Sequence, residues 1–438
     1  MPQSKSISLR FGQGRMALDL PESTRVLIGP EIPVLPNPEA AVREALQNPI
    51  GSDSLRAIAE RKQPKTVVIT ISDITRPVPN ELLVTAILEE LNAVGIPDSA
   101  CTVLIATGMH QHSTQEERDI LLGTELQRRV TVVDHESARS DTLVKITDDP
   151  PLSVNELYVN ADLKIVTGLI EPHFMAGFSG GRKGVCPGLV DLATIQRFHG
   201  YATMADANSV EGRLVGNPCH EIATETAQRV GVDFLVNVAI THDRELAGIY
   251  AGDMQEAFLV GCRDAAEWTT AKFDDSFDLV VTCAGGFPLD TSFYQTVKGM
   301  CTALPALRPG GTLLTLSACD RVGDAEYEAI YDRFGPDWRG FLKHIASQSE
   351  VNKDQWGYQM QTRVLEVAGI ERTIFANDGL SLQTQQKVAV TPAPGGGDAQ
   401  VRAQRFINQY IKDHPSARIA VIPEGPYTML TTPCLVAF

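Results

Sequence analysis

The sequence predicts an α/β protein of two domains, each built on a mostly parallel β-sheet flanked by helices. Its 438 residues exceed what one hydrophobic core usually organises. Short runs of β-branched residues recur along the chain, and each is followed by turn residues and then by a helical pattern. This alternation is typical of parallel strands joined by helical crossovers. With 43% hydrophobic residues, the chain has enough apolar material for two cores.

The first set of predicted elements lies in the N-terminal half of the chain. Asn80 is expected to cap a helix after the first strand, because its side chain can accept a hydrogen bond from a backbone N–H of the first turn. One apolar face of this helix is formed by Leu82, Leu83, Ala86, Ile87 and Leu91. The strands are expected at residues 66–71, 102–106, 130–133 and 163–166.

A second set of strands is expected at residues 278–281, 313–316 and 419–422. We place the domain boundary between a helical pattern at 254–270 and the strand that begins at 278. The expected domains are therefore residues 1–272 and 276–438. In an alternative arrangement, the last strand of the chain returns to the first domain.

The acidic composition narrows the classes of partner. The formal net charge is −16, from 38 Lys and Arg against 54 Asp and Glu. Such a surface argues against nucleic acid or an anionic membrane as a partner. If the substrate is an anion, the positive charges that bind it must be local. Arg and Lys residues at a pocket are therefore stronger candidates for substrate binding.

Neither the cysteines nor the N-terminus indicate an exported protein. The eight cysteines are scattered without a C-x-x-C pair, so buried free thiols are expected rather than disulfides or a zinc site. The first thirty residues hold no apolar signal region, and no stretch approaches the length of a membrane span. A cytoplasmic protein is the plain interpretation.

Chemically rich segments follow the predicted strands, at residues 72–80, 107–113, 168–184 and 285–298. In open parallel sheets, ligands bind beyond the carboxyl ends of the strands. All but one of these segments lie before residue 200. We therefore expect the active site in the cleft between the domains, belonging mainly to the first, with the second closing over it.

The densest segment is 171–184, in which four glycines fall within eight residues. Glycines let the backbone approach a ligand closely and present N–H groups to an anion. The segment matches neither a Walker A loop nor the Gly-x-Gly-x-x-Gly fingerprint. A phosphate-binding loop and a tight structural turn are both open on this pattern.

Three of the nine histidines stand at predicted strand or helix ends. His110 and His173 follow strand-end turns, and His199 follows a helix expected to begin at Asp191. Each alone is more often structural, but the three beside Lys183 favour a metal or acid–base site. A structural interpretation is kept for His135, His242, His344 and His414.

Two further segments offer groups that could bind an anion. Asp73, Thr75 and Arg76 leave the first strand together, and an Arg there can bind a carboxylate or phosphate through two parallel hydrogen bonds. A surface Arg–Asp pair is the alternative. Gln295 and Lys298 would share one helical face, for which solvation is the alternative.

In this order, the segments resemble the nickel-pincer lactate racemase family, from about residue 70 to about residue 300. No single motif is decisive, but the ordered set is highly specific. The matching stretches are Ser72-Asp73-Ile74-Thr75-Arg76-Pro77, Ala106-Thr107-Gly108-Met109-His110, Glu171-Pro172-His173 through Gly180-Gly181-Arg182-Lys183, His199-Gly200, and Tyr294-Gln295 with Lys298.

The resemblance implies a cofactor in the first domain. Lys183 would form a thioamide with a pyridinium-3,5-bisthiocarboxylate mononucleotide, the nickel-pincer nucleotide. Nickel would be held by one carbon and two sulfurs of the cofactor and by His199, since an imidazole suits nickel in such a set. The phosphoribosyl part would be lined by Asp73, Ile74, Thr75 and Arg76.

The resemblance also implies an activity. The protein would be a racemase or epimerase that inverts the α-carbon of a small, lactate-like 2-hydroxy acid by proton-coupled hydride transfer through a 2-oxo acid. His110 and His173 would be the acid–base pair on opposite sides of the substrate. Gln295 and Lys298 would bind its carboxylate, with Arg76 nearby. Accessory enzymes would build the cofactor.

Three other functions are open at this point. The first is an epimerase of a longer 2-hydroxy acid, such as a sugar acid, with the same machinery. The second is a nicotinamide-dependent dehydrogenase, which the missing dinucleotide fingerprint disfavours. The third is a non-catalytic carrier of the cofactor, which would not need two histidines. His112 is not part of the family pattern. It is either a surface residue or a residue that alters the pocket.

Overall fold

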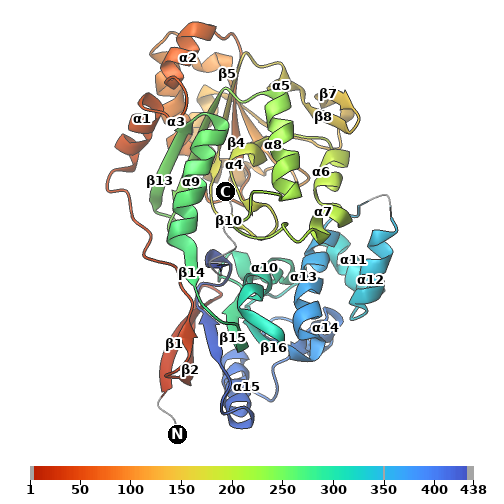
Figure 1. The fold of residues 1–438 in the computed structure, drawn as a ribbon. Coiled ribbons are helices and arrows are strands. Elements are labelled where there is room, and N and C mark those ends of the chain that lie inside the picture. The colour runs from red at the N-terminus through yellow and green to blue at the C-terminus, as the bar shows by residue number, and fades with distance from the viewer. Residues whose placement is uncertain (1–3, 349–350, 432–438) are drawn as a thin grey trace. The chain divides into compact units, whose positions relative to one another are not determined.

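The computed structural model describes residues 4–348 and 351–431, which divide into two compact units (Figure 1). The N-terminal unit comprises Glu31–His199 and Asn208–Ala266. The C-terminal unit comprises the stretch that ends at Pro30, the stretch that begins at Glu267, and Gly200–Ala207 between them. Each unit is an α/β structure with its own six-stranded sheet, so the predicted fold class is confirmed.

The sheet of the N-terminal unit has the strand order β13-β12-β9-β4-β5-β6. All neighbouring strands are parallel except β12 and β13, which are antiparallel. The chain order runs from β4 to β6 in one direction, and β9 then returns to the other side of β4. The strands are β4 Val67–Ser72, β5 Cys101–Ala106, β6 Thr131–Asp134, β9 Leu163–Leu169, β12 Phe234–Ile240 and β13 Leu246–Gly252.

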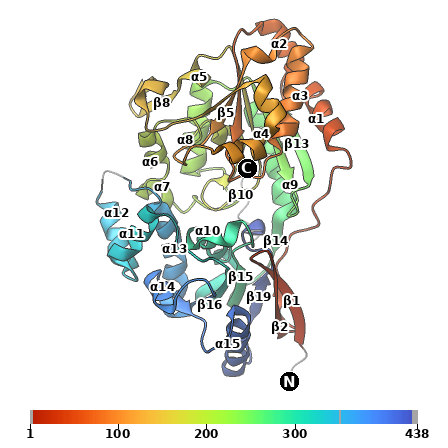
Figure 2. The same cartoon turned by 180° about the vertical axis from the view of Figure 1, so that it is seen from behind.

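Helices cover both faces of this sheet: α3 and α4 lie in front of it in Figure 2, and α8 lies in front of it in Figure 1. Because both faces are covered, the central strands are almost wholly apolar and buried, as in β4. The helices are α1 Pro38–Gln47, α2 Leu55–Lys62, α3 Asn80–Asn92, α4 Gln115–Arg129, α5 Glu156–Val159, α6 Leu192–Phe198, α8 Pro218–Val230 and α9 Met254–Thr269. Two short hairpins add β7 Leu143–Asp148 with β8 Pro151–Asn155, and β10 Pro172–His173 with β11 Gly177–Phe178.

The prediction that Asn80 caps α3 is wrong. Pro79 occupies the capping position with non-helical backbone angles, and Asn80 is the first helical residue. Within the described chain, no side chain caps this helix. The predicted apolar face is otherwise present, since Leu83, Ile87 and Leu91 are buried in the core of the unit.

The sheet of the C-terminal unit has the order β18-β17-β16-β15-β19-β3, with every pair parallel. Its strands are β3 Arg25–Val26, β15 Phe277–Cys283, β16 Leu307–Leu316, β17 Thr373–Ala376, β18 Thr391–Pro392 and β19 Ile419–Ile422. Its helices are α7 Tyr201–Ala205, α10 Phe293–Thr302, α11 Ala325–Phe334, α12 Trp338–Ala346, α13 Gln355–Ala368, α14 Leu382–Lys387 and α15 Ala399–Asp413.

The N-terminal segment belongs to the C-terminal unit, unlike in the sequence-based division at 272–276. The hairpin of β1 Ser4–Phe11 and β2 Gly14–Pro21 packs into the core of that unit with α15, and β3 pairs with β19. The reason is long-range pairing, which local periodicity does not report. The chain passes into this unit again within α9. The last described strand, β20 Met429–Thr431, pairs with β14 Thr270–Lys272 there. The alternative in which the last strand of the chain returns to the first domain stays a prediction.

The cysteines in the described part of the chain are all buried and free, as expected for small apolar side chains, while Cys434 lies outside it. No helix among the described residues is both long and apolar enough to cross a membrane.

Candidate active site

The candidate site is formed by three loops at the carboxyl edge of the N-terminal sheet. They follow β4, β5 and β9, and the chain order reverses between β4 and β9. Such a switch point leaves room beyond the strand ends, where open α/β sheets bind ligands. The segments 72–80, 107–113 and 168–184 meet at this edge because their strands are neighbours.

The loop after β4 is closed by Asp73, which is buried at its start. Its Oδ1 accepts hydrogen bonds from the Thr75 hydroxyl at 2.5 Å and from the Thr75 backbone N–H at 3.2 Å. Burial acts to raise the pKa of Asp73, but the hydrogen bonds from His110 and Thr75 and the charges of His110 and Arg76 hold it below its ordinary value. Ile74 is 37% exposed, and Arg76 pairs with Glu171 at 3.4 Å.

His110 stands on the loop after β5. Gly108 makes the turn possible, since its φ of 58° is left-handed and its N–H donates to the carbonyl of Gly188. The His110 side chain is more than half exposed, and its Nδ1 lies 2.5 Å from Oδ2 of Asp73. Because Asp73 holds Nδ1, Nε2 is the ring nitrogen that can meet a ligand.

His173 stands on the β10–β11 hairpin after β9. Its Nδ1 accepts backbone N–H groups from Ala176 at 3.2 Å and Met175 at 3.4 Å. Its half-buried ring stacks on Phe174, with centroids 5.2 Å apart. The hydrogen bonding at Nδ1 is thus the reverse of that at His110.

The glycine loop is packed against protein atoms. A side chain at Gly177, Gly180, Gly181 or Gly184 would collide with Arg213, Asn237, Phe258 or Val166, respectively. Asn237 also accepts the N–H of Gly181 at 2.6 Å. These glycines therefore serve close packing, which favours the tight structural turn over a phosphate cradle.

Arg182 is the internal brace of this loop. It is 1% exposed, and its guanidinium donates to the carbonyls of Ala176, Phe178 and Gly180 at 2.8–3.2 Å. It also lies 4.4 Å from the centre of the Phe258 ring. The sequence pattern gave Arg182 no separate role, because its partners are carbonyls that leave no signature in the residue types.

Lys183 follows directly. Burial lowers the pKa of its amine well below the ordinary value, and the nearby charges of Arg76 and Arg182 add to this. Its Nζ lies 6.0 Å from the Phe198 ring centre. The environment therefore favours a neutral, nucleophilic amine.

His199 ends α6, whose predicted start at Asp191 is confirmed as the capping residue. Its Nδ1–H donates to the Ile195 carbonyl at 2.9 Å. Burial lowers the pKa of His199 to about 3, although the hydrogen bond to the Ile195 carbonyl acts to raise it. The ring is thus neutral with its lone pair on Nε2, which is the form that binds a metal.

Gln295 and Lys298 lie on α10 of the C-terminal unit, one turn apart and half-buried. Ser292 caps this helix by accepting the Gln295 N–H. The Gln295 Oε1 is buried and has no hydrogen-bond partner among the described residues. The two residues form a group within their own unit, as the i, i+3 spacing predicts.

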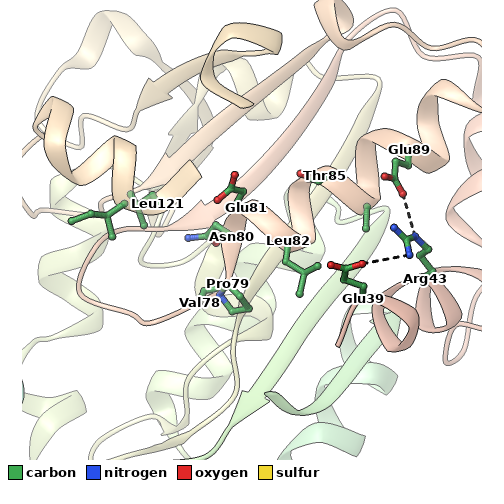
Figure 3. Close-up of a pocket in the computed structure, with 12 residues that line it drawn as sticks. Glu39, Arg43, Val78, Pro79, Asn80, Glu81, Leu82, Thr85, Glu89 and Leu121 are labelled. Carbon is green, nitrogen blue, oxygen red and sulfur yellow. Dashed lines mark hydrogen bonds and ion pairs between the residues drawn. The ribbon is translucent and has the colours of Figure 1, made fainter. Parts of the chain in front are cut away.

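One histidine of the candidate segments and one surface cavity are not part of the candidate site. His112 is exposed and its Nε2 lies 3.5 Å from Glu136, as expected for a surface residue. A surface cavity of about 530 Å³ between α1, α3 and α4 contains none of the predicted site residues. Figure 3 shows Arg43 of this cavity between Glu39 and Glu89.

The fold is a two-domain α/β structure with histidines and a buried lysine at the edge of a parallel sheet, an arrangement typical of an enzyme. Family models for the lactate racemase N-terminal and C-terminal domains match residues 11–212 and 273–429. Lactate racemase from Thermoanaerobacterium thermosaccharolyticum is 31% identical over 430 residues, covering 96% of this chain and 98% of that protein. Lactate racemase from Lactiplantibacillus plantarum is 32% identical over 394 residues, 88% of this chain and 89% of that protein. The chain belongs to the lactate racemase family and is an isomerase of the racemase type.

Solved structures agree with this assignment. The lactate racemase apoprotein from T. thermosaccharolyticum superposes with a TM-score of 0.87 at 31% identity, over 98% of this chain and 100% of that chain. A Thermotoga maritima protein superposes with a TM-score of 0.66 over 91% of this chain and 99% of that chain, and at 18% identity it shares the fold alone.

Proposed function

We propose that the protein inverts the α-carbon of a small 2-hydroxy acid such as lactate, through a 2-oxo acid intermediate. The observation that carries the proposal is the pair of histidines, His110 and His173, each held through Nδ1 on a loop at the sheet edge that also leads to the buried Lys183 and His199. The names of the two relatives supply the lactate-like substrate.

The residues fit the cofactor that the resemblance implies, a nickel-pincer nucleotide attached through Lys183. A neutral lysine amine can form the covalent link, and a protonated one could not. The neutral His199 ring, with its lone pair on Nε2, suits nickel. When bound, the group would take hydride from the substrate α-carbon and return it. Among the described residues, no three His, Cys, Asp or Glu side chains gather as a metal cluster of their own.

The chain's own residues would move the proton and hold the anion. One histidine accepts the hydroxyl proton as the Cα–H bond breaks, and the other serves the opposite face of the planar 2-oxo acid. Arg76, Gln295 and Lys298 would bind the carboxylate. Local cations are needed because the net charge of −16 repels an anion.

A panel of enantiopure acids tests this function. Protein produced together with cofactor-synthesis enzymes should carry nickel and racemise lactate without added NAD. Racemisation of longer, sugar-like acids in place of lactate would establish the epimerase alternative. A strict need for added NAD would establish the dehydrogenase. A nickel-loaded protein inactive on the whole panel would indicate a carrier.

A further inference from the structure

Both carboxylate oxygens of Asp73 face hydrogen-bond donors of the protein. Oδ1 accepts the Thr75 hydroxyl and N–H, and Oδ2 lies 2.5 Å from Nδ1 of His110. The side chain is buried, so water does not compete for these oxygens. The resemblance assigned Asp73 to the lining of the cofactor, but its hydrogen bonds are directed to His110 and to its own loop.

The contact with Asp73 determines which nitrogen of His110 carries the proton. The pKa of Asp73 is held below its ordinary value, so the carboxylate is ionised and can only accept. Nδ1 of His110 must therefore be the donor. In the neutral ring this leaves the lone pair on Nε2, the nitrogen that Asp73 does not hold.

His173 is held in the opposite state. Its Nδ1 faces the N–H groups of Met175 and Ala176, which can only donate. Nδ1 must then be the acceptor, and the proton of the neutral ring is on Nε2. In this conformation His173 presents a donor, whereas His110 presents a base.

We infer that Asp73 is a positioning residue that holds His110 as the ready base, so that the resting enzyme accepts the hydroxyl proton of one enantiomer more readily than that of the other. This inference rests on the proposed function. The proton passes from the substrate hydroxyl to Nε2 of His110, and the positive charge on the ring is stabilised by the Asp73 carboxylate. For the other enantiomer, Nδ1 of His173 must first leave its two backbone donors.

Asp73→Asn provides a sharp test because it should reverse the His110 tautomer. The Thr75 N–H can only donate, so the single side-chain oxygen of the introduced asparagine should face Thr75. The amide NH₂ would then face His110 and donate to Nδ1, which moves the ring proton to Nε2. The side-chain volume hardly changes, while the base at Nε2 is lost.

The tautomer can be read in the apoprotein by NMR of ¹⁵N-labelled histidine, at a pH at which the rings are neutral, with His110→Gln to assign the signals. We expect the Nδ1–H form of His110 in the unchanged protein and the Nε2–H form in Asp73→Asn. Thr75→Val, which keeps the carboxylate, should retain the Nδ1–H form. An Nε2–H ring of His110 in the unchanged protein would overturn the inference. So would a His110 tautomer that stays the same in Asp73→Asn.

Asp162→Asn is the matched control for loop damage. Asp162 also closes a loop through backbone N–H groups and a threonine hydroxyl, those of Lys65 and Thr66, but at the amino end of the sheet. It should leave the His110 signal unchanged. A tautomer change equal to that of Asp73→Asn would show an indirect effect and overturn the inference.

Rapid quenching of loaded enzyme with each enantiomer supplies the second measurement. Asp73→Asn should slow the first appearance of bound 2-oxo acid from one enantiomer by roughly 10²-fold or more, and from the other far less. Equal slowing from both would overturn the assigned asymmetry. If the unchanged protein forms no 2-oxo acid from either, the proposed function fails, while the apoprotein NMR still decides the role of Asp73.

Discussion

The Nε of Arg76 lies 3.4 Å from the Glu171 carboxylate, and this ion pair joins the loops after β4 and β9 at the switch point of the sheet. Both side chains are about one-third exposed, so water screens the pair only in part. A guanidinium has five donors, and Glu171 can hold Arg76 in place while other donors meet an anion. The pair therefore fixes Arg76 in place and leaves other guanidinium donors for the proposed substrate carboxylate.

We predict that Arg76→Met and Lys298→Met each weaken the use of the substrate anion. Each change removes a charge-assisted hydrogen bond. The fall in kcat/KM should therefore correspond to a loss of about 1.5–3 kcal/mol of transition-state stabilisation. Steady-state kinetics on loaded enzyme measures this. Arg61→Met is the control, because Arg61 pairs with Asp53 on the exposed surface of α2. Unchanged kinetics in both test variants would mean that other residues hold the carboxylate.

Lys183→Ala should abolish the covalent adduct. Burial lowers the pKa of Lys183, which favours a neutral, nucleophilic amine. Intact mass with peptide mapping of protein made with the cofactor pathway measures the outcome. Lys164→Ala is a matched control, since burial also lowers the pKa of Lys164, whose Nζ donates to the Val230 carbonyl. An adduct mapped to another lysine would contradict the assignment.

His199→Ala should reduce bound nickel, by about 10-fold or more in affinity as for loss of a metal-site group, while the apoprotein stays folded. Metal analysis and thermal unfolding measure the two effects separately. His220→Ala is the comparison: His220 is another histidine of this unit whose pKa burial lowers to about 4. Full nickel retention with normal activity in His199→Ala would show that His199 is structural.

The apoprotein should lose stability as the pH falls from about 6.5 to about 4. Burial lowers the pKa of His135 from 6.5 to about 4. Between these two pH values His135 is therefore protonated in the unfolded state and neutral in the folded state. The contribution of His135 to stability is therefore fully present above the unfolded pKa, and it declines by on the order of 3 kcal/mol as the pH falls to about 4. Urea unfolding at several pH values measures the slope, which should be shallower in His135→Gln. An equal slope in that variant would contradict the cause.

Local patterns carried most of the fold. The runs of β-branched residues predict β4, β5, β9 and β15 because buried parallel strands need apolar residues on both faces. They could not reveal β3, whose two residues have no periodicity and are held by pairing with β19. The cap of α3 failed for a local reason, since Pro79 takes the capping position before Asn80.

The sequence names a set of candidate site residues, but it does not reveal the contacts among them. His110 and Asp73 are 37 residues apart, and their contact depends on β4 and β5 being neighbours in register. Glu171 meets Arg76 only because β9 returns to the side of β4. Strand order is a property of the whole sheet, so partners across it leave no mark in the local sequence.

The last prediction concerns the hydrogen on the α-carbon. If it leaves as hydride and returns to the opposite face of the 2-oxo acid, substrate deuterated at that carbon should keep much of its label after racemisation in ordinary water. A primary isotope effect should accompany the reaction if this step limits the rate. Abstraction as a proton by His110 or His173 would instead exchange the label with solvent, because imidazole N–H groups exchange rapidly. His110→Ala and His173→Ala should each slow racemisation by roughly 10²-fold or more, because each ring serves one face. Their residual product should still retain deuterium. Mass spectrometry of both enantiomers during turnover reads the label, and its rapid, complete loss to water would defeat the hydride mechanism.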